Sequence, residues 1–172
     1  MGAMDPQGLI ARLESGPALL RGALAGITED ELRWSPAEGA WSALEVACHL
    51  LDEEREDFRV RLRLLLEEPD AEWPPIDPPR WAKERGYADR DLKPTLKEFE
   101  KERAASVAWL RGLDFDPDRR KVHPKFGAMT AGSLLGAWAA HDVLHLRQLA
   151  KLRYLYVKRL ADPHDIGYAG EL

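Results

Sequence analysis

The sequence contains only one cysteine, Cys48, and no long hydrophobic run. A single cysteine excludes a disulfide within the chain and is typical of a reducing compartment, so we expect a cytoplasmic protein. The apolar neighbours Val46 and Ala47 predict that this thiol is buried. No apolar stretch approaches the roughly 20 residues that span a bilayer, and no secretory signal is evident, so we expect no membrane partner.

An excess of positive charge is also lacking. The formal net charge of −5 argues against nucleic-acid binding, which depends on a basic surface. With 172 residues, 45% hydrophobic and 32% charged, the chain has the composition of one globular domain. The first six residues resemble an expression scar, so we expect a single domain over residues 7–172.

No strand pattern is convincing, whereas four segments have helical periodicity. Ser42 and Glu45 form a capping box that predicts the start of the second helix. Gly16 and Pro17 are expected to bend or split the first. The four predicted helices cover residues 5–25, 42–67, 92–111 and 130–159.

The predicted helices are joined by one long irregular connection, residues 68–91, and by a loop at 114–129. The connection is rich in proline and carries Trp73 and Trp81. It is either a passive crossover with two aromatic anchors or a lid over a pocket. Four amphipathic helices with one long crossover predict an all-α four-helix bundle.

Two histidines, His141 and His145, carry the strongest functional signal. Their spacing of four residues places both imidazoles on one helical face, close enough to reach one metal ion. The same face is otherwise suited to core packing, since it comprises Leu134, Trp138, His141, His145, Gln148, Leu152 and Leu155. Buried polar groups must be satisfied, and a shared metal ion would satisfy them, although an ordinary hydrogen-bonded pair is the alternative.

Several strings resemble motifs of the DinB-like (YfiT-like) metal-binding superfamily, in the same order along the chain. They are Trp41–Glu54, Trp34–Pro36, His123-Pro124 with Gly127 and Thr130, and His141–Gln148. The resemblance implies an up-down-down-up bundle, often dimeric, so we expect a homodimer. It also implies a divalent metal held by His49, His141 and His145. Imidazoles suit zinc, nickel, copper or iron, and we expect zinc or nickel.

Other candidate site residues surround these ligands. Glu53, one turn after His49, is either a general base, a partner of that ligand, or an exposed carboxylate. Gln148, Trp138 and His123 are candidate substrate-binding residues, and Phe126 is a candidate pocket wall. Asp142 points away from His141 and is not expected to be a ligand.

Three protein ligands with one open position are typical of a catalytic rather than a structural metal. The resemblance implies a thiol S-transferase or a related metal-dependent hydrolase acting on a small molecule. Low-molecular-weight thiols such as bacillithiol, mycothiol or glutathione are the implied partners. The alternative is a non-catalytic metal-binding stress-response protein.

Overall fold

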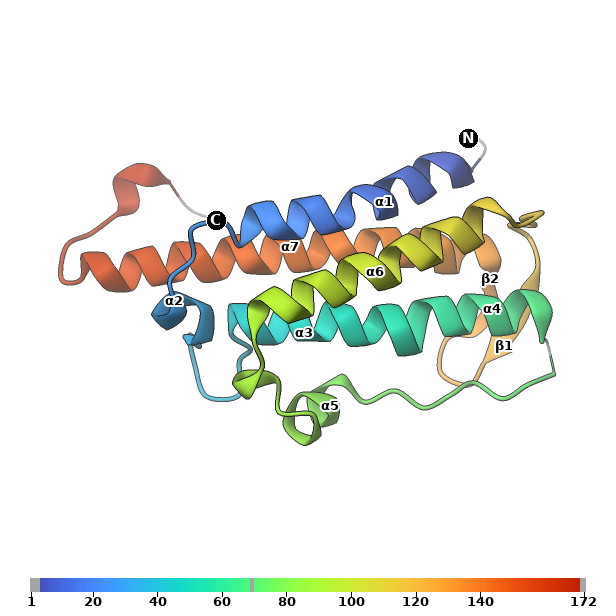
Figure 1. Ribbon diagram of the computed structural model, residues 1–172, viewed down its shortest axis with the longest axis horizontal. Helices are drawn as coiled ribbons and strands as arrows, with labels where there is room; N and C mark the ends of the chain where they lie inside the picture. Colours follow the sequence, from blue (N-terminus) through green and yellow to red (C-terminus); the bar gives the residue numbers. More distant parts are fainter. Residues whose placement is uncertain (1–3, 69, 171–172) are drawn as a thin grey trace.

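Four long helical segments lie side by side in the computed structural model, which describes residues 4–68 and 70–170 (Figure 1). They are α1 (Pro6–Ala23), α3 (Ala43–Glu53) continued by α4 (Arg59–Glu67), α6 (Leu92–Arg111) and α7 (Ala131–Ala161). α1 and α7 run in one direction, and α3–α4 and α6 run in the other. The expected all-α four-helix bundle with up-down-down-up topology is therefore confirmed.

Shorter elements connect the bundle helices. They are α2 (Glu29–Arg33), α5 (Pro78–Glu84), the 3-10 turns η2 (Tyr87–Asp89) and η3 (Gly167–Ala169), and the strands β1 (Arg120–His123) and β2 (Gly127–Thr130). Within the described ranges, none of the helices combines the length and the apolarity that a bilayer crossing requires.

The hairpin β1–β2 corrects the expectation of a loop without strands. Its strands pair in antiparallel register, with Arg120 opposite Thr130 and His123 opposite Gly127. Only Lys121 is buried in the two strands. Because the hairpin buries almost no apolar side chain, its sequence lacks the alternation by which strands are recognised. The crossover also contains more structure than expected, since α5 and η2 lie within it.

Side-chain caps fix where the helices begin. The Ser42 hydroxyl accepts from the Glu45 N–H, and the Glu45 carboxylate accepts from the Ser42 N–H at 2.8 Å, which confirms the predicted capping box. Thr130 and Ser133 cap α7 in the same reciprocal way. Asp5 caps α1 by accepting from the N–H of Gly8.

α1 passes through Gly16 and Pro17 as one continuous helix, so it is not split. A proline cannot donate to the carbonyl four residues earlier, which here belongs to Leu13. The guanidinium of Arg103 on α6 donates to that carbonyl at 2.9 Å instead. The missing helical hydrogen bond is thus replaced by a bond to a neighbouring helix.

The second predicted helix is interrupted by a π-helical turn, η1 (Glu54–Phe58), between α3 and α4. Periodicity predicted one uninterrupted helix here. Three residues of the turn, Glu54, Asp57 and Phe58, are buried. Such turns are frequent at functional sites, and this one follows His49 by one helical turn.

A polar layer divides the apolar core into two clusters. One cluster includes Leu20, Leu51, Phe99 and Leu149, and the other includes Leu13, Phe58, Val107 and Trp138. Each bundle helix contributes to both clusters. The level between the clusters contains Gly16 and Pro17 of α1, Asp52 to Asp57 of the second bundle segment, Arg103 of α6 and Asp142 of α7. The three candidate metal ligands, His49, His141 and His145, lie at this level.

Candidate metal centre

Three imidazoles converge within the polar layer. His49 projects from α3, and His141 and His145 project from successive turns of α7. The Nε2 atom of His49 lies 3.4 Å from that of His141 and 3.1 Å from that of His145. The Nε2 atoms of His141 and His145 are 3.1 Å apart. The structure therefore brings together the three residues that the resemblance implied as ligands.

The triangle of nitrogens has the size of one face of a metal coordination sphere. Two nitrogens at about 2.0–2.1 Å from an ion are about 3.3–3.4 Å apart at a tetrahedral angle and about 2.9 Å apart at a right angle. The observed separations of 3.1–3.4 Å lie in this interval. The arrangement fits one divalent cation, and the described residues add no fourth histidine, cysteine or carboxylate to the group.

The protonation of the ring nitrogens also suits a cation. The Nδ1–H of His145 donates to Oε1 of Gln148 at 2.8 Å, which leaves a lone pair on Nε2. Burial, followed by the charges of His145 and His141, lowers the pKa of His49 to about 2. Burial, followed by His145 and Arg103, lowers the pKa of His141 to about 3. Neutral imidazoles are the form that binds metal.

Glu53 lies behind His49. Its Oε1 is 3.7 Å from Nδ1 of His49, which is too long for a hydrogen bond. Neither atom has a hydrogen-bond partner among the described residues. Burial, followed by the carboxylate of Asp57, raises the pKa of Glu53 to about 8. The two groups are close enough for a small movement to join them. Glu53 is 4% exposed, so the alternative of an exposed carboxylate is wrong.

Aromatic rings flank the imidazoles. The Trp41 ring centroid lies 4.7 Å from that of His49, and the Phe58 centroid lies 4.9 Å from that of His141. Sequence reasoning did not assign either ring to the site. Trp41 directly precedes the capping box, and Phe58 is placed by the π turn, which periodicity does not reveal.

Of the other predicted site residues, some lie beside the three histidines and some lie elsewhere. Gln148 contacts His145, as described above. Trp138 is 1% exposed, and its Nε1–H donates to Glu54 at 3.0 Å, so its placement makes it a packing residue rather than a wall of the site. His123 lies in the hairpin beside Arg61 of α4, and Phe126 is exposed next to it. Burial raises the pKa of the Cys48 thiol to about 11, which opposes a nucleophilic role.

A second polar cluster, the Arg103 cluster, lies next to the histidines. Arg103 is 2% exposed and donates to Glu54 at 2.9 Å and to Asp142 at 2.5 and 3.0 Å. Asp142 is therefore engaged in an ion pair, in agreement with its exclusion as a ligand. Glu54 follows Glu53, and Asp142 follows His141, so the Arg103 cluster fixes the helices that carry the ligands. Sequence reasoning missed this cluster.

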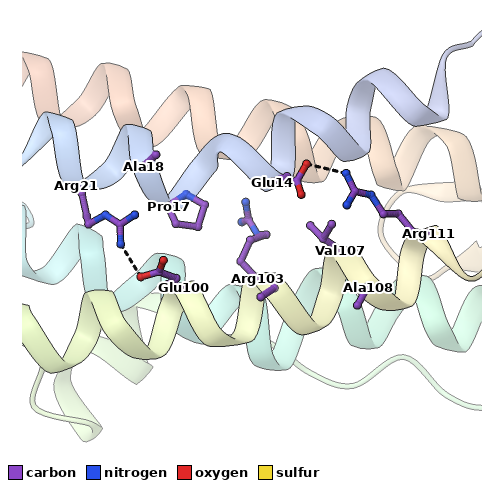
Figure 2. A pocket seen from close by; sticks show the side chains of 10 residues that line it. Glu14, Pro17, Ala18, Arg21, Glu100, Arg103, Val107, Ala108 and Arg111 are labelled. Carbon is purple, nitrogen blue, oxygen red and sulfur yellow. Dashed lines mark hydrogen bonds and ion pairs between the residues drawn. The ribbon is translucent and has the colours of Figure 1, made fainter.

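A groove of about 290 Å³ lies between α1 and α6, and Arg103 is one of the residues that line it (Figure 2). Two ion pairs, Arg21–Glu100 and Glu14–Arg111, flank it there. None of the three histidines lines this groove.

Comparison with known proteins identifies the family. A family model described as the DinB superfamily matches residues 12–149. The chain belongs to the DinB superfamily.

Two relatives carry names that refer to metal chemistry. A protein of Oceanobacillus iheyensis, provisionally named a metal-dependent hydrolase, is 27% identical over 144 residues, which are 83% of each chain. A protein of Geobacillus kaustophilus with the same provisional name is 28% identical over 153 residues, covering 88% of this chain and 85% of the relative.

Solved structures share the fold. YfiT from Bacillus subtilis, provisionally described as a metal-dependent hydrolase with an unusual four-helix bundle topology, superimposes with a TM-score of 0.80 at 24% identity, over 91% of each chain. TT2238, a four-helix bundle protein, gives a TM-score of 0.60 at 25% identity, over 86% of this chain and 99% of the other.

Proposed function

We propose that this DinB superfamily member is a metal-dependent enzyme that holds a divalent ion, zinc or nickel, through His49, His141 and His145. We further propose that it transfers a low-molecular-weight thiol to an electrophilic small molecule, with hydrolysis as the related alternative. The observation that carries the proposal is the triangle of three Nε2 atoms no more than 3.4 Å apart. The provisional names of the relatives support metal-dependent hydrolytic chemistry.

A divalent ion held by these three histidines would supply Lewis acidity, which lowers the pKa of a metal-bound water or thiol. The side chains around it orient the ligands. Gln148 accepts the Nδ1–H of His145 and so fixes both its tautomer and its ring plane. Glu53 faces Nδ1 of His49, on the far side of the ring from Nε2. We therefore propose that Glu53 is a positioning residue for His49 rather than a general base.

The aromatic rings of Trp41 and Phe58 give the site an apolar border. Both rings contact an imidazole, at 4.7 and 4.9 Å between centroids. An apolar border limits the access of water to the site and favours the binding of a thiol or an apolar electrophile there.

One observation favours the non-catalytic alternative. His49 is only 4% exposed and lies within the polar layer of the core. A metal at this depth would also stabilise the bundle, since binding to the folded state alone adds to the free energy of unfolding. A metal-binding protein without turnover is therefore the second candidate.

The test is metal-dependent turnover of a thiol-reactive electrophile with a panel of cellular thiols. We expect turnover with at least one thiol, loss on chelation, recovery on adding zinc or nickel, and loss in His141→Ala. The matched control is His164→Ala, which replaces an exposed histidine. Ester hydrolysis without thiol dependence would identify the hydrolase, and metal retention without any turnover would contradict catalysis.

The homodimer, the cytoplasmic location and the absence of nucleic-acid partners stay predictions. Sedimentation velocity of the purified protein checks the dimer directly.

A further inference from the structure

His123, in the turn between β1 and β2, presents a hydrogen-bond donor toward α4. Its Nδ1 accepts from the backbone N–H groups of Lys125 at 3.0 Å and Phe126 at 3.3 Å. A neutral imidazole has one N–H, so a ring whose Nδ1 accepts carries its hydrogen on Nε2. Partial burial, followed by the charge of Arg61, lowers the pKa of His123, which keeps the ring neutral.

Arg61 presents a second donor at the same point. Its side chain is 7% exposed, its Nε–H pairs with the carboxylate of Asp57, and its Nη2–H donates to the carbonyl of Pro74 at 2.7 Å. Its Nη1 lies 3.3 Å from Nε2 of His123. Among the described residues, no acceptor pairs with Nη1. Two N–H groups therefore face one another without an acceptor between them.

The surroundings suit an anion that has an apolar part. The Trp73 ring lies 5.4 Å from that of His123, and its Nε1–H anchors the crossover to the Val122 carbonyl at 2.7 Å. The Phe126 ring lies 4.9 Å from that of His123 and is 66% exposed. Lys125 adds a positive charge above Phe126. The only carboxylate that contacts the guanidinium among the described residues, that of Asp57, is held at Nε, away from Nη1.

We propose that Arg61 and His123 bind a carboxylate group of the substrate, an inference that rests on the proposed function. The two carboxylate oxygens accept one hydrogen bond from Nη1 of Arg61 and one from Nε2 of His123. These two hydrogen bonds, one of them from a charged donor, give each of the facing N–H groups an acceptor.

The position of this carboxylate site relates it to the metal centre. Phe58 contacts His141, and Arg61 follows Phe58 by three residues, about 5 Å along the helix axis. A row of ionisable side chains at four-residue intervals joins the two places, namely His49, Glu53, Asp57 and Arg61. An extended molecule whose reacting group lies at the histidines can therefore place an acidic group at the hairpin.

Binding of succinate to the purified full-length protein tests the carboxylate site. We expect saturable binding by calorimetry and a shift of the His123 Nε2–H resonance in protein labelled with ¹⁵N-histidine. His123→Asn keeps an acceptor for the two turn N–H groups but lacks Nε2–H, so it should bind about tenfold more weakly. Arg61→Lys keeps a charge for Asp57 but loses the planar fork, and it should also bind more weakly.

Three controls make the result decisive. His164→Asn, at an exposed histidine, should bind succinate as the parent protein does. Succinamide, which is uncharged, should not bind. His141→Ala, which disrupts the proposed metal centre, should retain succinate binding, because Arg61 and His123 are not metal ligands. Unchanged affinity in both His123→Asn and Arg61→Lys, with native circular dichroism, would overturn the proposal.

The outcome separates this inference from the proposed function. If thiol turnover is metal-dependent, His123→Asn should raise the KM of an acidic substrate while leaving kcat and the KM of its amide unchanged. An equal KM for the acid in both proteins would overturn the carboxylate site and leave the metal-dependent function standing. Succinate binding without metal or turnover would remove the proposed function and leave the carboxylate site standing.

Discussion

The two buried polar clusters of this bundle lie side by side and differ in how their hydrogen bonds are satisfied. In the Arg103 cluster, each side-chain nitrogen of Arg103 has an oxygen acceptor, supplied by Glu54, Asp142 and the Leu13 carbonyl. In the histidine cluster, three neutral rings direct their Nε2 atoms at one another, and no carboxylate or N–H of the described residues completes them.

The difference shows how a binding site can be recognised inside a core. A buried polar group without a partner is unfavourable, so a cluster that satisfies itself supports the fold, whereas one that does not satisfy itself requires a ligand. The Arg103 cluster fits the first description except at Oε1 of Glu54, which has no partner among the described residues. The histidine cluster fits the second. Substitutions in the two clusters should therefore affect different properties.

The largest expected effect is on stability. Arg103→Met removes the guanidinium and leaves the carboxylates of Glu54 and Asp142 buried without their partner. We expect a loss of about 3–5 kcal/mol in the free energy of unfolding, measured by urea denaturation. Arg21→Met, which breaks an ion pair with about half-exposed side chains, should cost less than about 1 kcal/mol. Equal losses of unfolding free energy in the two variants would show that the Arg103 cluster stabilises the fold no more than a surface ion pair does.

The converse substitution is His141→Ala. We expect metal affinity to fall by more than about a hundredfold, because losing a ligand exceeds the effect of losing a ligand's partner. The free energy of unfolding of the metal-free protein should change by less than in Arg103→Met, since no charge loses its partner. Competition with a chromophoric chelator measures the first quantity, and urea denaturation in chelator measures the second. Unchanged metal affinity would contradict the assignment of His141.

The Arg103 cluster can also be disturbed from α1. A Cβ at Gly16 would lie 2.6 Å from Nη1 of Arg103 and 2.6 Å from Oδ2 of Asp142. Gly16→Ala should therefore destabilise the protein by about 1–3 kcal/mol. Gly22→Ala, in the same helix with nothing within 4 Å, should stabilise it by up to about 1 kcal/mol. Thermal unfolding of the two variants gives the comparison, and a stabilising Gly16→Ala would show that Arg103 does not need this space.

The smallest expected effect concerns the orientation of one ligand. Gln148→Leu removes the acceptor for Nδ1–H of His145 and should weaken metal binding about tenfold. Gln148→Glu keeps an acceptor and should retain the affinity. Equal weakening in both variants would show that the contact at 2.8 Å does not orient the ring.

Much of the fold follows from local signals. The bounds predicted for the third bundle helix are those of α6, and the capping box at Ser42 fixes the start of α3. His141 and His145 are adjacent because helical spacing makes them so. His49 falls at the edge of its helical face by periodicity, and only the family resemblance indicated that it joins them.

Part of the Arg103 cluster could be predicted from the sequence. Phe99, Arg103 and Val107 are spaced by four residues, so Arg103 lies on the buried face of α6. Its acceptor at Leu13 is 90 residues away, and no local rule pairs a guanidinium with a carbonyl freed by Pro17. The π turn and the exposed hairpin leave no periodic pattern, so they were not predicted.

Elemental analysis of the purified protein beside its His49→Ala variant tests the central claim most directly. The account predicts one equivalent of a divalent metal per chain in the parent protein and loss of that metal in the variant. A parent protein that acquires no metal from excess zinc or nickel, or a variant that retains its full equivalent, would contradict it.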